Sequence, residues 1–353
     1  MSDLLDLAAI SLLPTRLWRL AADGMRGREP PSCVLARLVA ARWPDAASRV
    51  ATLRAKAAAA IARAHAAAIV SVAWNDPAYP EVLRTIVDPP ALLWTRGSSA
   101  SLNGVAVAIV GSRAASPYAL SVAEQLAGDL AARGVVIVSG LARGVDSAAH
   151  RGALAAGGIT VAVLGSGVDV IYPREHASLA AAIDERGAVV SELVPGTPPT
   201  PFFFPLRNRI ISGLSRAVVV VEANERSGSL ITARCALDQG RDVLAVPGNV
   251  LTGRNRGAHA LLRDGAKIVE SADDILEELG LAARKSAIVS NDASPADPIL
   301  ACLTPGEPSD LDEIADRSGL ETATLLPRLF ELELQGTIAR VGGGRFVRVD
   351  KPC

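Results

Sequence analysis

The segment PFFFPLRNRIISGLSRAVVVVEANERSGSLITARCALDQGRDVLAVPG, residues 201–248, decides the fold. Its pattern predicts a helix, then a strand with four valines at Val218–Val221. A second helix follows, opened by Ser227-Gly228-Ser229, and then an apolar strand at 242–246. Three of the chain's five phenylalanines, Phe202–Phe204, stand directly before Arg207-Asn208-Arg209. Aromatic rings beside guanidinium groups and a helix N-terminus suit a flexible anionic ligand with flat faces, a description that single-stranded nucleic acid fits.

Short apolar strands alternate with helices upstream of this segment as well. The run Val105–Val110 leads into a helix that we expect from Pro117, with Ser116 as its N-cap, to about Arg133. Further strands are predicted at 135–138, 160–164 and 189–190. Fully apolar strands that alternate with helices indicate a parallel sheet covered on both faces. We therefore predict a doubly wound, mostly parallel, Rossmann-like α/β domain over about 105–280, with its ligand crevice at the carboxyl ends of the strands.

Three further regions flank this domain. Residues 1–70 have helical apolar spacing, which predicts a small helical domain used for packing or partners. Residues 71–104 are rich in proline and are predicted to form a connector with a short strand near Ala91–Thr95. Residues 281–297 are polar and are predicted to be a linker. Residues 298–353 predict three helices and a hairpin around Gly342–Gly344, the order of a winged helix.

Composition narrows the class of protein. The 353 residues suggest two or three domains, and the net charge of −1 excludes a surface coated with positive charge but not a single basic groove. The cations are almost all arginine, so an anion site here would be built from forked guanidinium groups. The four cysteines and four histidines are scattered, which argues against a zinc site. We expect no signal peptide and no membrane span, and hence a cytoplasmic protein.

Small polar loops end three of the predicted strands. They are Gly111-Ser112-Arg113, Ser139-Gly140 and Ser227-Gly228-Ser229, and each precedes a helix. Taken singly, each loop could be no more than a tight turn between a strand and a helix. Opening onto one crevice beside Arg113, they are expected to offer backbone N–H groups and helix dipoles to a phosphate.

The phenylalanine segment is expected to supply the stacking surface. Because Phe202–Phe204 lie between Pro201 and Pro205, we expect an extended segment with at least one ring facing the crevice. Arg207 is predicted to start the following helix, where a cation opposes the dipole and so suggests an external anion. An ion pair with Glu222 is the structural alternative. Arg209 is expected to lie off the buried stripe of that helix.

The sequence gives little support for catalysis. Glu192, Glu222 and Glu225 lie near strand ends and paired carboxylates can act as acid and base, but no nucleophile with an adjacent base is evident. Gly165-Ser-Gly167 lacks the third glycine of a dinucleotide fingerprint, so no nicotinamide cofactor is expected. His150 and His176 are expected to be packing or surface residues. We therefore predict a protein without catalysis, cofactor or metal.

Several motifs, in the correct order, resemble the DNA-processing protein A (DprA/Smf) family. They are Val110-Gly-Ser-Arg113, Ser139-Gly-Leu-Ala-Arg-Gly-Val-Asp-Ser-Ala-Ala-His150, Tyr172-Pro173, Ser191-Glu192, Phe204-Pro-Leu-Arg-Asn-Arg-Ile-Ile211, Val221-Glu222, Ser227-Gly-Ser-Leu-Ile-Thr232, Gly240-Arg-Asp242 and Val246-Pro-Gly248. The resemblance covers about residues 74–270, and the C-terminal winged helix resembles the one appended to many members. Residues 1–70, taken as a SAM-like helical domain, match the family poorly.

The resemblance implies an extended Rossmann fold that binds single-stranded DNA without chemistry. It also implies a homodimer that protects incoming DNA and loads the RecA recombinase onto it during natural transformation. Family members line the DNA pocket with residues that correspond here to Arg113, Arg174, Phe204, Arg207 and Arg209. Together with the loops, the predicted nucleic-acid site comprises Gly111, Ser112, Arg113, Gly140, Arg174, Phe204, Arg207, Asn208, Arg209, Ser227, Gly228 and Ser229.

Two departures and two alternatives accompany this resemblance. Pro201 stands where some relatives have a basic residue, and the third winged-helix helix, 321–335, carries Arg328 as its single cation, which favours a protein contact over duplex reading. That acidic helix also disfavours a transcription regulator. A nucleotide phosphoribohydrolase, which shares the Rossmann core, would need a Glu soon after its glycine loop, whereas no carboxylate follows Thr232 before Asp238.

Overall fold

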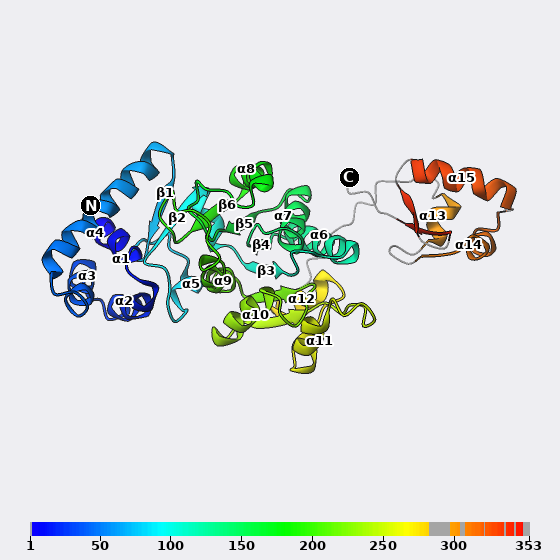
Figure 1. Ribbon diagram of the computed structural model, residues 1–353. Helices are drawn as coiled ribbons and strands as arrows, with labels where there is room; N and C mark the ends of the chain where they lie inside the picture. Colours follow the sequence, from blue (N-terminus) through cyan, green and yellow to red (C-terminus); the bar gives the residue numbers. More distant parts are fainter. Residues whose placement is uncertain are drawn as a thin grey trace. The chain divides into compact units, whose positions relative to one another are not determined.

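The computed structural model describes residues 2–281, 297–303, 308–320, 322–334, 337–341 and 344–348 (Figure 1). The chain divides into two compact units, Met1–Lys285 and Ser286–Cys353. Residues 282–296, most of the predicted linker, lie outside the described residues. None of the described helices is long and apolar enough to cross a membrane.

A mostly parallel sheet forms the centre of the first unit, as the alternating apolar runs predict. In the described part of the chain it has nine strands in the order β1-β2-β6-β5-β4-β3-β7-β8-β9. The pairs from β6 to β9 are parallel. These strands are β3 Ala106–Val110, β4 Val136–Ser139, β5 Thr160–Val163, β6 Ala188–Ser191, β7 Ala217–Val220, β8 Asp242–Ala245 and β9 Lys267–Ile268.

Two antiparallel strands extend one edge of this sheet. β2 (Leu92–Gly97) pairs with β6, and β1 (Val70–Ala73) pairs with β2. The proline-rich segment is therefore more than a connector, because its strands belong to the sheet. The prolines fall outside both strands, where a missing N–H removes no ladder hydrogen bond. The short helices α5 (Glu81–Arg84) and η2 (Ser99–Asn103) complete this segment.

Helices cover both faces of the sheet (Figure 1). Residues of β3 alternate between two apolar cores, with Ala108 and Val110 in one and Val107 and Ile109 in the other. The first core includes residues of α9 (Phe203–Gly213), α10 (Ser229–Asp238) and α11 (Arg256–Arg263). The second includes residues of α6 (Pro117–Ala132), α7 (Val145–Ala155) and α12 (Ala272–Glu278), and α7 contacts α8 (Ala177–Arg186). Strands that are apolar along their whole length need both faces covered, and the helices on the two sides of this parallel sheet provide that cover.

The order of the strands reverses between β3 and β7. The chain runs outward from β3 through β4 and β5 to β6, then returns to β7 on the other side of β3. Loops that leave the carboxyl ends of β3 and β7 therefore diverge to opposite faces. A crevice is expected at such a switch point.

The phenylalanine segment differs from the expected extended conformation. Helix α9 already begins at Phe203, and Phe202 has helical backbone angles of φ −63° and ψ −34°. Pro205 is the third helical residue, a position where its missing N–H and fixed φ are tolerated. Arg207 consequently lies in the second turn rather than at the helix start, so opposition to the dipole does not explain it. The expectation that Arg209 lies off the buried face is also wrong, since only 6% of it is exposed.

The N-terminal helices pack against the antiparallel edge of the sheet. They are α1 Ser2–Ser11, η1 Thr15–Leu17, α2 Trp18–Arg26, α3 Pro31–Ala40 and α4 Ala46–Ala66. Their apolar core, which includes Leu7, Ile10 and Leu35, also contains Trp94 of β2 and Val168. The core is therefore shared between these helices and the sheet.

The second unit has the predicted winged-helix order. Helices α13 (Pro298–Cys302), α14 (Leu311–Ser318) and α15 (Thr322–Leu334) precede a hairpin of β10 (Ile338–Val341) and β11 (Arg345–Arg348). Its small core includes Ile299, Ile314, Leu329 and Phe346. Gly342 and Gly343, with the ends of the third predicted helix at Glu321 and Gln335, lie outside the described residues.

Candidate nucleic-acid interface

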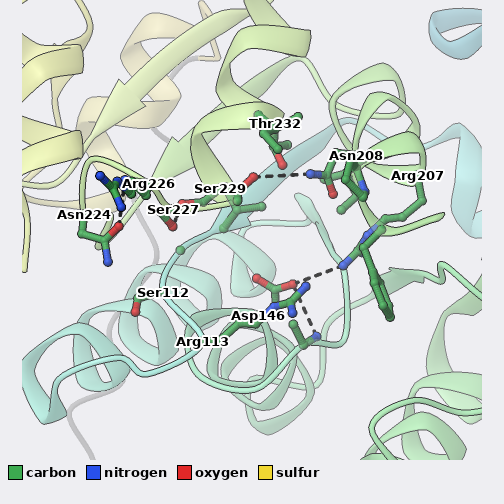
Figure 2. Close-up of a pocket in the computed structure, with 18 of the residues that line it drawn as sticks. Ser112, Arg113, Asp146, Arg207, Asn208, Asn224, Arg226, Ser227, Ser229 and Thr232 are labelled. Carbon is green, nitrogen blue, oxygen red and sulfur yellow. Dashed lines mark hydrogen bonds and ion pairs between the residues drawn. The ribbon is translucent and has the colours of Figure 1, made fainter. Parts of the chain in front are cut away.

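A cavity of about 410 Å³ opens at the switch point between β3 and β7 (Figure 2). One side is formed by the loop after β3, and the other by the loop after β7 together with the start of α10. Helix α9 closes the cavity with Phe204, Arg207 and Asn208. With Ala142 and Asp146 the cavity joins segments from four parts of the chain. Its polar lining includes Ser112, Arg113, Asp146, Arg207, Asn208, Asn224, Arg226, Ser227, Ser229 and Thr232.

The loop after β7 is held by local hydrogen bonds. The Arg226 amide donates to the Asn224 side chain at 2.9 Å, and the hydroxyls of Ser227 and Ser229 lie 2.7 Å apart. Asn208 donates from α9 to the carbonyl of Gly228, with N and O 3.4 Å apart. Helix α10 begins at Ser229, so the positive end of its dipole lies at the cavity beside the exposed Arg226. This is an environment suited to an anion.

The Ser139-Gly140 loop was expected to offer backbone N–H groups to a phosphate, but its contacts differ. The amides of Gly140 and Ala142 are taken up by the protein itself, because they donate to the Asp146 carboxylate at 3.1 and 3.4 Å. Gly140 instead leaves room for Arg207. A Cβ atom at this position would lie 1.7 Å from Nη1 of Arg207.

Arg207 is a buried cation beside a buried carboxylate. Its Nη1 donates to the Val163 carbonyl at 2.6 Å, and its Nη2 lies 3.8 Å from Asp146. Burial lowers the pKa of Arg207 to about 10, against the attraction of Asp146. Burial likewise raises the pKa of Asp146, although Arg207 opposes this. For both groups, therefore, desolvation outweighs their mutual attraction. The predicted alternative partner, Glu222, accepts instead from Ser116.

Phe204 is the one of the three phenylalanines that lines the cavity. The Arg113 guanidinium lies 5.3 Å from the centre of the Phe204 ring, within cation–π range, and Arg113 is exposed. The centre of the Phe204 ring also lies 5.5 Å from that of Tyr172. Phe202 is 61% exposed and packs against Phe203.

A second hollow of about 350 Å³ lies on the far side of the Arg113–Phe204 pair. It is lined by Arg143, Tyr172 and Pro173 and also contains Gly140 and Arg207. Arg113, Phe204 and Arg207 line both spaces, so the Arg113–Phe204 pair lies between a polar cavity and a hollow with an aromatic wall. This arrangement presents phosphate-binding and base-stacking groups side by side.

Most of the predicted site residues come together here. Gly111, Ser112, Arg113, Phe204, Arg207, Asn208, Ser227, Gly228 and Ser229 line the first cavity, and Gly140 lines the second. In the structure as described, Arg174 and Arg209 line neither of these cavities. Arg174 is exposed in the short helix η3 (Arg174–His176). Arg209 is ion-paired with Asp88 at 3.0 Å and Glu192 at 2.9 Å.

Sequence reasoning missed part of the lining. Asp146 and Tyr172 stand inside the motifs quoted above, but no periodicity indicates that Asp146 pairs with Arg207, 61 positions further along the chain. For Asn224 and Arg226 the sequence offered one signal, because both directly precede the Ser227-Gly228-Ser229 loop that opens α10. Thr232, one turn into that helix, is buried at the cavity and ends one of the quoted motifs, but nothing in the sequence indicates that its side chain faces the cavity.

Two of the three carboxylates considered for acid–base chemistry are engaged by other residues, and the third, Glu225, is exposed. Glu222 accepts from the Ser116 hydroxyl at 2.6 Å, and Glu192 holds Arg209. His150 is fully buried, and its Nδ1 lies 2.6 Å from the Thr160 hydroxyl. In the described ranges no group of three His, Cys, Asp or Glu residues is placed to hold a metal ion. The geometry of the cavity is thus better suited to binding than to general acid–base work.

Known proteins with similar sequences share this fold. Residues 70–280 match the family model for DNA recombination-mediator protein A, and residues 283–344 match that for the DprA winged helix domain. Protein Smf of Escherichia coli is 44% identical over 286 residues, which are 78% of this chain and 76% of that protein. DNA processing protein DprA of Streptococcus pneumoniae is 48% identical over 203 residues, 58% of this chain and 72% of that one.

Solved structures of DNA processing protein A resemble this chain in fold as well as in sequence. The crystal structure of DprA from Streptococcus pneumoniae matches with a TM-score of 0.67 and 39% identity, over 77% of this chain and 95% of that one. DNA processing protein A from Helicobacter pylori, described for its single-stranded DNA binding mode, matches with a TM-score of 0.55 and 30% identity, over 60% and 95% of the two chains. Since a family model spans well over half of its residues, this chain belongs to the DNA recombination-mediator protein A family.

Proposed function

We propose that the cavity at the switch point binds single-stranded DNA. Phosphates would lie between Arg113, Arg226 and the start of α10, while a base stacks on Phe204. The observation that carries this proposal is the Arg113–Phe204 pair, 5.3 Å apart, which stands between a polar cavity and an aromatic hollow. Stacking on a ring within such a hollow requires an unpaired base, which favours single strands over duplex.

We further propose that the protein acts in the cytoplasm, without catalysis, as a homodimeric recombination mediator. In this role it protects incoming single strands and loads the RecA recombinase onto them during natural transformation. Membership of a family named for recombination mediation supports the mediator role. The absence of catalysis is supported by Asp146, the carboxylate in the cavity, because it accepts from the Gly140 amide and is paired with Arg207.

The binding proposal is tested by fluorescence anisotropy of a labelled oligo-dT at two salt concentrations. We expect preference for the single strand over a duplex of equal length. Arg113→Ala should weaken binding about tenfold and lower the salt slope by about 0.7, the loss of one phosphate contact. Phe204→Leu should weaken it by about 1–3 kcal/mol with the slope unchanged, because it removes stacking.

The matched control is Phe202→Leu, a ring that is exposed and outside the cavity lining, which should bind like the wild type. Equal affinity for single strand and duplex would contradict the proposal. The mediator role is tested by RecA filament assembly on strands coated with single-strand-binding protein. No acceleration by the wild type, or equal acceleration by Arg113→Ala, would count against it.

A further inference from the structure

We infer that Arg209 is a positioning residue through which the N-terminal helices fix α9, and that it does not contact nucleic acid. Helix α9 carries Phe204, Arg207 and Asn208, so its placement sets the geometry of the cavity. This inference rests on the proposed function, and it narrows the packing or partner role predicted for the N-terminal helices to the placement of α9.

The two arginines of α9 point in different directions. They are two residues apart and are therefore separated by about 200° around a helix. Arg207 reaches the Val163 carbonyl and lines the cavity. Arg209 reaches Asp88 and Glu192 and is 6% exposed. An arginine turned away from the cavity and enclosed by carboxylates has no free donor face to offer a phosphate there.

Arg209 joins three separate segments to α9. Its Nε donates to Asp88, in the loop before β2, at 3.0 Å, and its Nη2 donates to Glu192, just after β6, at 2.9 Å. The guanidinium lies 5.4 Å from the ring of Trp18, the first residue of α2. Although burial opposes its charge, the two carboxylates raise the pKa of Arg209 above its ordinary range. The cation is therefore held permanently charged between them.

Trp18 completes the connection to the N-terminal helices. Its indole nitrogen donates to the Leu13 carbonyl at 3.0 Å, which fixes the ring. The same ring lines a small space with Phe203, Leu206 and Ile210 of α9. A second residue of α2, Arg26, donates to the Val87 carbonyl at 2.7 Å, beside Asp88. The N-terminal helices thus contact both α9 and the loop that holds Arg209.

The experiment compares four single variants in the full chain: Arg209→Gln, Arg209→Lys, Trp18→Leu and, as the matched arginine control, Arg113→Ala. Affinity for oligo-dT is measured by anisotropy at several salt concentrations. Arg209→Gln and Trp18→Leu should each weaken binding about five- to tenfold without changing the salt slope, since neither removes a phosphate contact. Arg209→Lys should recover part of the affinity, because it restores the charge but not the fork.

Hydrogen exchange of residues 203–213 in the DNA-free protein provides the second measurement. Exchange there should be faster in Arg209→Gln and Trp18→Leu and unchanged in Arg113→Ala, because only the first two loosen α9. A salt slope lowered by Arg209→Gln, or unchanged affinity and exchange in both variants, would overturn the inference. If the wild type itself does not bind oligo-dT, the proposed function fails, while the exchange comparison still decides whether Arg209 and Trp18 hold α9.

Discussion

His150 is a fully buried imidazole on α7 that contacts Thr160 of β5. Its Nδ1 lies 2.6 Å from the Thr160 hydroxyl, which itself donates to the Ile137 carbonyl, so Nδ1 is the donor. Its Nε2 is buried and, among the described residues, has no hydrogen-bond partner. Burial, reinforced by Arg207, lowers the pKa of His150 from 6.5 to about 3. The ring is therefore neutral in the folded protein at every ordinary pH.

This residue makes folding stability depend on pH. Because the folded pKa is lower than the unfolded one, the stabilisation is complete above pH 6.5 and is lost as pH falls toward 3. In that window the free energy of unfolding should fall more steeply in the wild type than in His150→Leu, by up to about 1.4 kcal/mol per pH unit. Urea unfolding at pH 7, 6, 5 and 4 measures this. Asp146 and Glu192, whose burial raises their pKa values, are present in both proteins, so the difference isolates His150. Parallel curves would contradict this assignment.

Helix α9 illustrates, at the scale of an element, what the sequence could and could not predict. The strands were predictable because continuous valine and isoleucine runs are typical of parallel sheets, and the loops after β3 and β7 followed from the rule for strand ends. The start of α9 was not predictable. Its two neighbouring prolines, Pro201 and Pro205, suggested an extended chain, but a proline in the first turn of a helix is tolerated. The burial of Arg209 was also unpredictable, since it depends on Asp88, which is 121 residues away in the chain.

The fit between α9 and the Ser139-Gly140 loop is tight enough to test. Gly140→Ala would place a Cβ 1.7 Å from Nη1 of Arg207, so the guanidinium must move. We expect a loss of about 1–3 kcal/mol in unfolding free energy, from overpacking, with weaker oligo-dT binding. Gly228→Ala is the control, because a Cβ there meets nothing within 4 Å and the backbone already has φ −63°. Its unfolding transition should match that of the wild type. Equal stability of both variants would mean that Arg207 is not packed as described.

At the scale of the whole molecule, the cavity belongs entirely to the first unit. All of its lining residues lie within Met1–Lys285, which has its own apolar cores. A protein shortened to residues 1–281 should therefore bind oligo-dT within about twofold of the full chain, at equal salt slope. Anisotropy of the two proteins side by side measures this. A large loss of affinity would assign part of the binding surface to the winged-helix unit. That unit should then bind a labelled strand when produced alone.

The Arg113–Phe204 pair has a consequence for how a strand enters. In the free protein the ring is already covered, because the guanidinium lies over it. A base that stacks on this ring takes the place of the guanidinium, which then needs a new anionic partner, and the strand carries one in its own backbone. Entry is thus an exchange of partners in which sugar-phosphate and base must arrive together. Free nucleobases and abasic strands each bring only half of that exchange, and both should compete poorly with an intact oligonucleotide.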